Sequence, residues 1–327
     1  MKVILPMAGK GTRLLPATKF VPKPLIRLAG RSVLDRLMDK VLALDVDELL
    51  IITGHLKEKL EEHVVDNYDV PARFIEQKVQ DGTATAVHLA QPYVDGPVLI
   101  VFVDTIFDVE LAIDENGTDD GTIWVHEVED YQRFGVIVTD SDGYMTKIVE
   151  KPSEPVSRLA NVGLYYIRDS AALFAGIDWT MSRPPYKGEY FLTDAFQHMV
   201  DNGKKIKIEP IRGWYDCGKL ETTLDTNRYL LENGGDRVTE EFTNVKIEHP
   251  IYIGDDVLLE DCSIGPNVSV DDGTTIHHSS IRDSIIGRNS KVVDSTVTRS
   301  LIGDCSEISD DFLEGAIVAR DERAEAP

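Results

Sequence analysis

Residues 3–14 read VILPMAGKGTRL, and the rest of the chain is interpreted outward from this stretch. The run Val3-Ile4-Leu5 is typical of a short buried strand, and Gly9 and Gly11 allow a sharp turn directly after it. A glycine-rich turn at a strand end lets backbone N–H groups approach the oxygens of a phosphate closely. The stretch therefore predicts an anion-binding turn, with a glycine turn carrying a solvated basic face as the alternative.

Positive charge is concentrated around this turn. The first 40 residues carry nine basic side chains against two acidic ones, in a chain whose formal net charge is -23. This contrast favours a phosphate ligand, to which Arg13 could make a two-pronged contact and Lys23 could add a mobile charge. The turn is neither a Walker A loop, which needs Gly-Lys-[Ser/Thr], nor a dinucleotide fingerprint, because Leu14 occupies the last glycine position.

Length and composition limit the possible classes of protein. A chain of 327 residues can bury a large core and is expected to form one large and one smaller domain. The three cysteines are too few and too scattered for a disulfide framework or a zinc site, which fits a reducing cytoplasm. No apolar run is long enough to cross a membrane, no signal-peptide pattern is present, and the acidic balance argues against nucleic acid as a partner.

Up to about residue 232, strand-like and helix-like runs alternate. Ser32 is the expected cap of a helix that begins at Val33, and the apolar run 98–103 is an expected buried strand that ends at Asp104. This rhythm predicts a Rossmann-like, mostly parallel sheet with helices on both faces, whose ligands bind at the carboxyl ends of the strands. Further strands are expected at 48–53 and 73–76, and further helices at 57–65 and 83–90.

The tail follows a different rule, because aliphatic residues return about every sixth position between Val245 and Ile308. Ile264-Gly265-Pro266-Asn267-Val268 and Ile286-Gly287-Arg288-Asn289-Ser290 are two copies of one pattern. This repeat predicts a parallel β-helix, and a β-sandwich of short strands is the alternative. We therefore divide the chain into an α/β domain (1–240), a β-helix of hexapeptide repeats (241–315) and a polar tail (316–327).

This combination resembles the sugar-1-phosphate nucleotidyltransferases, most closely the long glucose-1-phosphate thymidylyltransferases that end in a left-handed β-helix. The match covers nearly the whole chain and is anchored by Gly9-Lys10-Gly11-Thr12-Arg13 with Lys23-Pro24. The resemblance implies a reaction between a nucleoside triphosphate and a sugar 1-phosphate that gives an NDP-sugar, with dTDP-glucose or UDP-glucose as the product. It implies catalytic roles for Arg13 and Lys23, and nucleotide contacts at Leu5, Ala8, Gly9, Gly11, Thr12, Gln77, Gly82 and Thr83.

The resemblance also implies a metal site and a sugar-phosphate site. Asp104 and Asp216 match the metal-binding aspartates of the family, and carboxylates are hard oxygen ligands that suit Mg²⁺. Lys151 would hold the sugar phosphate, Glu150 and Asn161 would bind sugar hydroxyls, and Trp214 could pack on the sugar. The full sugar-phosphate set is Gly135, Glu150, Lys151, Asn161, Tyr165 and Trp214.

Some positions depart from the family pattern. Val103 and Thr105 flank Asp104 where glycine and asparagine are common, and Phe134 replaces a frequent tyrosine. The stretch 13–19 also resembles bacterial uridylyltransferases, so both uracil and thymine stay open as the base. Two other functions stay open as well: a catalytically silent regulatory subunit, and a bifunctional enzyme whose β-helix transfers acyl groups.

We expect the β-helix to assemble subunits into a homo-oligomer, because open coil ends and flat faces need covering. All residues assigned to catalysis lie before Gly218. Removal of the chain beyond Asn244 is therefore expected to leave the chemistry possible and to change assembly.

Overall fold

The computed structural model describes residues 1–114, 117–239 and 242–320. The chain forms two compact units that interleave along the sequence. Unit 1 comprises Met1–Gly9, Leu37–Val103 and Phe107–Trp214, and unit 2 comprises Lys10–Arg36, Asp104–Ile106 and Tyr215–Pro327. The boundaries of these units differ from the predicted linear division near residue 240. That division falls outside the described residues.

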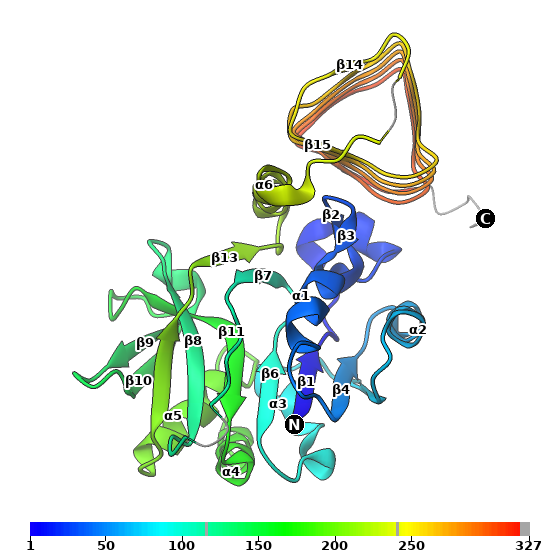
Figure 1. The fold of residues 1–327 in the computed structure, drawn as a ribbon. Helices are drawn as coiled ribbons and strands as arrows, with labels where there is room; N and C mark the ends of the chain where they lie inside the picture. Colours follow the sequence, from blue (N-terminus) through cyan, green and yellow to red (C-terminus); the bar gives the residue numbers. More distant parts are fainter. Residues whose placement is uncertain (115–116, 240–241, 321–327) are drawn as a thin grey trace. The chain divides into compact units, whose positions relative to one another are not determined.

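Unit 1 is built on a sheet that has nine strands within the described residues, with the order β10-β9-β11-β6-β1-β4-β5, in which β8 also pairs with β11 and with β12 (Figure 1). The pairs β1–β4, β1–β6 and β4–β5 are parallel, whereas β11 is antiparallel to β6, β8 and β9. The strands are β1 (Lys2–Pro6), β4 (Glu48–Thr53), β5 (Ala72–Glu76), β6 (Val98–Val101), β8 (Gly121–Glu127), β9 (Gly135–Thr139), β10 (Met145–Glu150), β11 (Leu159–Ile167) and β12 (Ile206–Pro210).

The Rossmann-like α/β sheet is confirmed, and its second half makes it a mixed sheet. The turn between β9 and β10 is short, and a short turn can join only antiparallel neighbours. The helices are α1 (Val33–Val41), α2 (Lys57–Asn67), α3 (Thr83–His88), α4 (Ser170–Met181), α5 (Leu192–Asp201) and α6 (Leu220–Leu230). The predicted cap is confirmed: Ser32 Oγ accepts from Asp35 N at 3.0 Å, and the Asp35 carboxylate accepts from Ser32 N at 3.2 Å.

The core of unit 1 includes residues of both the parallel and the antiparallel strands, together with residues of α4 and α5. Ile4, Leu50 and Ile100 are fully buried, as expected for strands that read as continuous apolar runs. Because β1 and β6 are parallel, Ala8 and Gly9 follow β1 at the same edge of the sheet at which residues 102–103 follow β6. This is the carboxyl edge, where a ligand is expected to bind.

In unit 2, fourteen short strands among the described residues form the predicted left-handed parallel β-helix, and Figure 1 shows its coils stacked with a triangular cross-section. Ser263 pairs with Lys246 and with Ser280, a repeat of 17 residues, and the next pair, Ser280 with Thr296, shortens it to 16. The three sheets are β14 (Lys246–Ile247), β17 (Ser263–Ile264), β20 (Ser280–Arg282), β23 (Thr296–Thr298) and β26 (Phe312–Glu314); β15 (Ile251–Ile253), β18 (Val268–Val270), β21 (Ile285–Ile286), β24 (Leu301–Ile302) and β27 (Ile317–Val318); and β16 (Leu258–Glu260), β19 (Thr275–His277), β22 (Lys291–Val293) and β25 (Glu307–Ser309).

The aliphatic repeat fills the inside of these coils. Ile264, Ile286 and Ile302 are fully buried and belong to one apolar core. The corners between the sheets turn through left-handed backbone, mostly at Asn, Asp and Gly, which tolerate it best, as at Asn267 and Asn289. The last strand, β27, lies beyond residue 315, and residues 321–327 of the predicted tail are outside the described part.

The remaining elements are short. In unit 2 the stretch after Gly9 contains the 3₁₀ turns η1 (Thr12–Leu14), η2 (Ala17–Lys19) and η3 (Lys23–Leu25), followed by the hairpin of β2 (Arg27–Leu28) and β3 (Arg31–Ser32). Strand β7 (Thr105–Asp108) pairs with β13 (Gly213–Asp216). Among the described helices, none combines the length and the apolar character that spanning a membrane requires. The other turns are η4 (Gln91–Tyr93), η5 (Tyr131–Arg133) and the π-helical η6 (Leu231–Gly235).

Candidate functional site

The turn after β1 in unit 1 is held by hydrogen bonds to its backbone. Met7 N donates to Ile52 O at 2.8 Å, and the side-chain amide of Gln80 donates to Ala8 O at 2.6 Å. A Cβ added to Gly9 would meet no atom within 4 Å, so a ligand could approach the backbone there. The Leu5 side chain is fully buried, which leaves only its backbone atoms for a ligand.

The predicted base-reading residues gather at the start of α3. The buried Gln77 donates from Nε2 to Thr85 Oγ1 at 3.2 Å and to Gly82 O at 3.4 Å. Gly82 has φ of +136°, and its Cα lies so close to the Tyr190 backbone that any side chain would overlap it. Thr83 Oγ1 accepts from Leu192 N at 2.9 Å. The structure therefore brings Gln77, Gly82 and Thr83 together in one rigid turn.

In unit 2, Gly11 rather than Gly9 takes the left-handed backbone, with φ of +62°. A Cβ at Gly11 would lie 2.9 Å from Thr18 Cγ2 and 3.2 Å from Lys23 Cβ, so only glycine fits beside the lysine. Thr18 also donates to Gly11 O at 2.9 Å. The structure thus brings Gly11 and Lys23 together, while the Thr12 and Arg13 side chains on η1 are exposed.

Two aspartates and a lysine of unit 2 gather around the buried Cys217. Lys23 Nζ lies 3.2 Å from Asp104 Oδ2, and Cys217 N donates to Asp104 O at 3.0 Å. Asp216 accepts from Gly218 N at 2.7 Å and from Thr222 Oγ1 at 3.3 Å. Burial raises the pKa of the Cys217 thiol to about 12, Lys23 opposes this shift, and Asp216 and Asp104 add to it. The thiol is therefore an inert protonated group between three charged side chains.

The two aspartates have the chemistry of a magnesium site. Asp104 and Asp216 supply carboxylate oxygens, the hard donors that Mg²⁺ prefers, and the Lys23 ammonium lies against Asp104. Within the described ranges, no three His, Cys, Asp or Glu side chains are grouped to hold a metal by themselves. Mg²⁺ commonly takes one or two carboxylates and completes its coordination with water and substrate phosphate oxygens. The donor set of Asp104 and Asp216 therefore fits Mg²⁺ together with a phosphate ligand.

The predicted sugar-binding residues form a connected cluster on β9, β10 and β11 of unit 1. Asn161 Nδ2 donates to Gly135 O at 2.8 Å, and Tyr165 donates its hydroxyl proton to Asn161 Oδ1. A Cβ on Gly135 would lie 2.9 Å from the Glu150 Oε2 atom, so glycine is required there. Thr193 donates to the same Glu150 oxygen at 3.1 Å. Burial raises the pKa of Glu150 above its ordinary value, while Lys151 and Thr193 oppose the shift.

A cavity of about 680 Å³ opens beside this cluster, lined by Glu150, Lys151, Arg183, Tyr186 and Phe191 among others. Lys151 has a left-handed φ of 43°, which is uncommon for a residue with a side chain. Its ammonium lies 3.6 Å from Glu150 Oε1 and 4.7 Å from the centre of the Phe191 ring. Lys151 therefore presents a positive charge at the edge of a space large enough for a sugar phosphate.

Trp214 lies apart from these contacts, against Phe134, with the ring centres 4.7 Å apart at 63°. Its buried indole N–H has no hydrogen-bond partner in the described structure. An edge-to-face pair of this kind is typical of aromatic packing, and the unpaired indole N–H could donate to a ligand oxygen.

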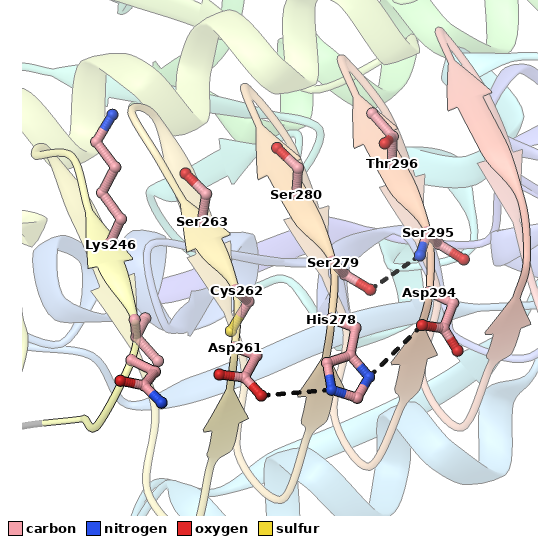
Figure 2. A pocket seen from close by; sticks show the side chains of 12 residues that line it. Lys246, Asp261, Cys262, Ser263, His278, Ser279, Ser280, Asp294, Ser295 and Thr296 are labelled. Atoms are coloured by element: carbon pink, nitrogen blue, oxygen red, sulfur yellow. Dashed lines mark hydrogen bonds and ion pairs between the residues drawn. The ribbon is translucent and has the colours of Figure 1, made fainter.

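A larger hollow of about 880 Å³ lies on the face of the β-helix, far along the sequence from the residues above (Figure 2). In Figure 2 the His278 ring lies between Asp261 and Asp294 of the flanking coils, with nitrogen–oxygen distances of 3.4 and 3.5 Å. Burial raises the pKa of the neighbouring Cys262 thiol to about 11. Both ring nitrogens of His278 lie near carboxylates of the flanking coils. His278 also has the left-handed backbone typical of the corners of these coils.

Three contributing residues are missing from the sites predicted by sequence. Gln80 anchors Ala8, Thr193 binds Glu150, and Cys217 links Asp104 to Asp216. Gln80 lies between the predicted nucleotide contacts Gln77 and Gly82, and Cys217 follows a predicted metal ligand, so the sequence pointed to both positions. Thr193 is the second residue of an amphipathic helix, and nothing in its sequence separates it from an ordinary first-turn residue.

Comparison with protein families gives a match over residues 2–233 to the family described as nucleotidyl transferase. The chain is 33% identical to the bifunctional protein GlmU of Methanococcus aeolicus, over 93% of this chain and 78% of that protein. It is 31% identical to the UTP--glucose-1-phosphate uridylyltransferase AglF of Haloferax volcanii, over 71% of this chain and 97% of that protein.

A solved structure has a similar fold. The crystal structure of UDP-glucose pyrophosphorylase complexed with UDP-glucose matches 71% of this chain and 98% of its own, with a TM-score of 0.61. The sequence identity is 21%, so this likeness concerns the fold.

Proposed function

Because the chain belongs to the nucleotidyl transferase family, we propose that it couples a nucleoside triphosphate to a sugar 1-phosphate and releases pyrophosphate. A sugar-phosphate oxygen attacks the α-phosphorus and forms a new P–O bond. The bond from the α-phosphorus to the oxygen bridging to the β-phosphorus breaks, and pyrophosphate leaves with that electron pair. The observation that carries the proposal is the contact of Lys23 with Asp104, whose carbonyl oxygen accepts a hydrogen bond from Cys217, the residue after Asp216.

The reaction needs positioning and charge neutralisation more than a general base, because the attacking phosphate is already ionised. Lys23 would stabilise negative charge on the triphosphate, and the exposed Arg13 could bind the departing pyrophosphate with two hydrogen bonds. The Gly9 and Gly11 backbone would lie close to the phosphates. Asp104 and Asp216 would hold Mg²⁺, which when bound supplies Lewis-acid neutralisation of the phosphate oxygens.

The sugar phosphate is proposed to bind at the cluster of unit 1. Asn161 and Glu150 would form hydrogen bonds with sugar hydroxyls, while Lys151 would bind the phosphate at the edge of the cavity. The connected hydrogen bonds through Gly135, Tyr165 and Thr193 hold these side chains in place before a ligand arrives. Such preorganisation supports a catalytic rather than an accidental cluster.

UTP and glucose 1-phosphate are our first substrate pair, supported by the relative from Haloferax volcanii. The test is pyrophosphate release over a grid of UTP, dTTP and ATP against glucose, N-acetylglucosamine and mannose 1-phosphates. We expect a pyrimidine nucleotide with glucose or N-acetylglucosamine 1-phosphate to give the highest kcat/KM. A flat grid without turnover would favour the catalytically silent regulatory alternative. The acyl-transfer alternative stays open, because the relative from Methanococcus aeolicus is described as bifunctional.

A further inference from the structure

The stretch Lys10–Arg36, called the loop segment here, carries Arg13 and Lys23 and packs within unit 2 on the β-helix. Arg27 is one polar anchor of this segment. The Arg27 Nε atom lies 3.1 Å from Asp271 Oδ1, and Nη2 lies 3.2 Å from Asp272 Oδ2. The Asp271 side chain is only 2% exposed, so this contact joins the loop segment to a buried residue of the β-helix.

Apolar packing surrounds this ion pair. Ile285 and Leu301 alternate with the inward-facing Ile286 and Ile302, so they point out of the coils, yet they are 2% and 3% exposed. They line a gap of only about 30 Å³ together with loop-segment residues. The loop-segment residues at this gap are Ala17, Val21, Leu25, Ile26 and Arg27.

The hairpin after Arg27 is anchored as well. Ala29 N donates to Asn227 Oδ1 at 2.9 Å and to Ser269 Oγ at 3.2 Å, and all three groups are buried. Gly30 lies flat against the Tyr252 ring, where a side chain would overlap the aromatic carbons. One face of the β-helix is thus covered by the segment that carries the proposed phosphate-binding residues.

The anchored end of the segment is four residues from Lys23. The 3₁₀ turn η3 begins at Lys23 and ends two residues before Arg27, and a Cβ added at Gly11 would lie only 3.2 Å from Lys23 Cβ. A shift of the anchor would therefore move Lys23 relative to Asp104. Buried ion pairs add little net stability because desolvation offsets their attraction, but removal of one partner is costly because it leaves an uncompensated buried charge.

We propose that Arg27 and Asp271 are positioning residues of the nucleotide site, through which the β-helix holds the loop segment in its catalytic arrangement. The inference rests on the proposed function for its kinetic consequences. The β-helix is then a working part of the active site, in addition to any role in assembly.

The test uses the full-length chain with Asp271→Asn, Arg27→Ala and the double variant. We expect kcat to fall roughly tenfold or more and the nucleotide KM to rise, because small displacements of a catalytic group are costly. The KM for the sugar phosphate should change less than twofold, since its proposed binding residues lie in unit 1. The double variant should be no worse than either single variant, as expected for one interaction. Arg27→Lys, which keeps the charge but loses the fork, should restore part of the nucleotide KM.

Arg299→Ala is the control, because it removes an ion pair of 2.9 Å with Glu314 on another part of the β-helix. It should keep wild-type kinetics. Unchanged kcat and nucleotide KM in folded Asp271→Asn, or equal shifts of both KM values, would overturn the proposal.

Amide hydrogen exchange of residues 12–25 provides a readout that does not depend on activity. Exchange there should be faster in Asp271→Asn than in wild type or Arg299→Ala, and equal exchange would count against the positioning role. Absence of turnover in the wild type, with faster exchange in Asp271→Asn, would refute the proposed function and leave the structural coupling intact.

Discussion

Cys217 marks the point at which the charged residues of the proposed nucleotide site meet. Its amide binds Asp104 O, its neighbour is Asp216, and the pKa of its thiol responds to Lys23 and to both aspartates. A thiol in this place cannot act as a nucleophile, because burial raises its pKa and keeps it protonated up to about pH 12. Catalysis at this point must therefore come from the surrounding charges.

Asp104→Asn and Asp216→Asn test the metal assignment. Each change removes a negative oxygen ligand but keeps the shape of the side chain, so turnover should fall about 100-fold or more. Turnover is measured against MgCl₂ concentration, and Asp310→Asn at an exposed β-helix corner serves as the control. Full activity of both aspartate variants in EDTA would contradict the assignment.

Lys151→Ala tests the separation of the two substrate sites. The ammonium at the edge of the cavity has no role in our nucleotide site, so the sugar-phosphate KM should rise at least tenfold, which corresponds to about 1.4 kcal/mol. The nucleotide KM should change little. Lys147→Ala, at an exposed lysine of β10 outside the cavity lining, is the matched control for a loss of charge. Equal increases in both KM values would contradict the assignment of Lys151.

At the scale of secondary structure, periodicity predicted most elements of both units. The strand at Glu48–Thr53 and the helix starts at Val33, Lys57 and Thr83 agree with the structure, because apolar spacing and capping are local signals. The structure also confirms the predicted coils, because their inward-facing aliphatic residues recur at a regular spacing in the sequence. The antiparallel half of the sheet was not predicted, because pairing between β11 and β6 joins residues far apart in the chain.

The sequence predicted site residues where a motif combines glycine with charged residues. It did not predict residues that are placed by packing between distant segments. Gly11 and Gly82 take the positive φ values that glycine permits, as the motifs suggested, whereas Gly9 is open and needs no special conformation. The contact of Arg27 with Asp271 is separated by 244 residues and carries no local pattern. Such a contact depends on the packing of a segment on a β-helix face, which sequence spacing does not encode.

The pH dependence of stability tests the ion pair between Arg27 and the buried Asp271. Burial raises the pKa of Asp271 from 3.8 to about 6, with Arg27 opposing the shift. Because the folded-state pKa is raised, protonation of Asp271 favours the folded state. This stabilising contribution is complete below about pH 4 and is lost as pH rises through 6. The loss amounts to ~3 kcal/mol, at about 1.4 kcal/mol per pKa unit.

The amide introduced by Asp271→Asn cannot titrate, so the free energy of unfolding of this variant relative to wild type should increase from pH 4 to about 6.5 and then level off. Chemical denaturation of both proteins across this range measures the difference. Asp272→Asn, at the neighbouring position on the same arginine, is the control. A difference that stays constant with pH would contradict the burial argument.

At the scale of the whole molecule, the β-helix and the loop segment belong to one compact unit. The sequence alone led to the expectation that the chemistry survives without the coils, because every assigned catalytic residue precedes them. The packing of Ile285 and Leu301 under the loop segment leads to the opposite expectation. Removal of the coils would expose these loop-segment contacts to water and release the anchor of Lys23.

A chain ending at residue 243 should therefore lose most nucleotide turnover as well as any assembly that depends on the coils. Light scattering measures the oligomeric state, circular dichroism measures the fold of the remaining sheet, and steady-state kinetics measures turnover. A folded truncated protein with wild-type kcat and nucleotide KM would show that the β-helix serves assembly alone.

The most direct measurement of the central claim follows oxygen atoms through the reaction. Wild-type protein is incubated with UTP, Mg²⁺ and glucose 1-phosphate that carries oxygen-18 in its non-bridging phosphate positions, and the products are analysed by ³¹P NMR and mass spectrometry. Direct attack on the α-phosphorus predicts labelled UDP-glucose, with the label in its phosphate–phosphate bridge, and unlabelled pyrophosphate. Label in the pyrophosphate, or nucleotide cleavage that proceeds equally well without the sugar phosphate, would contradict the account.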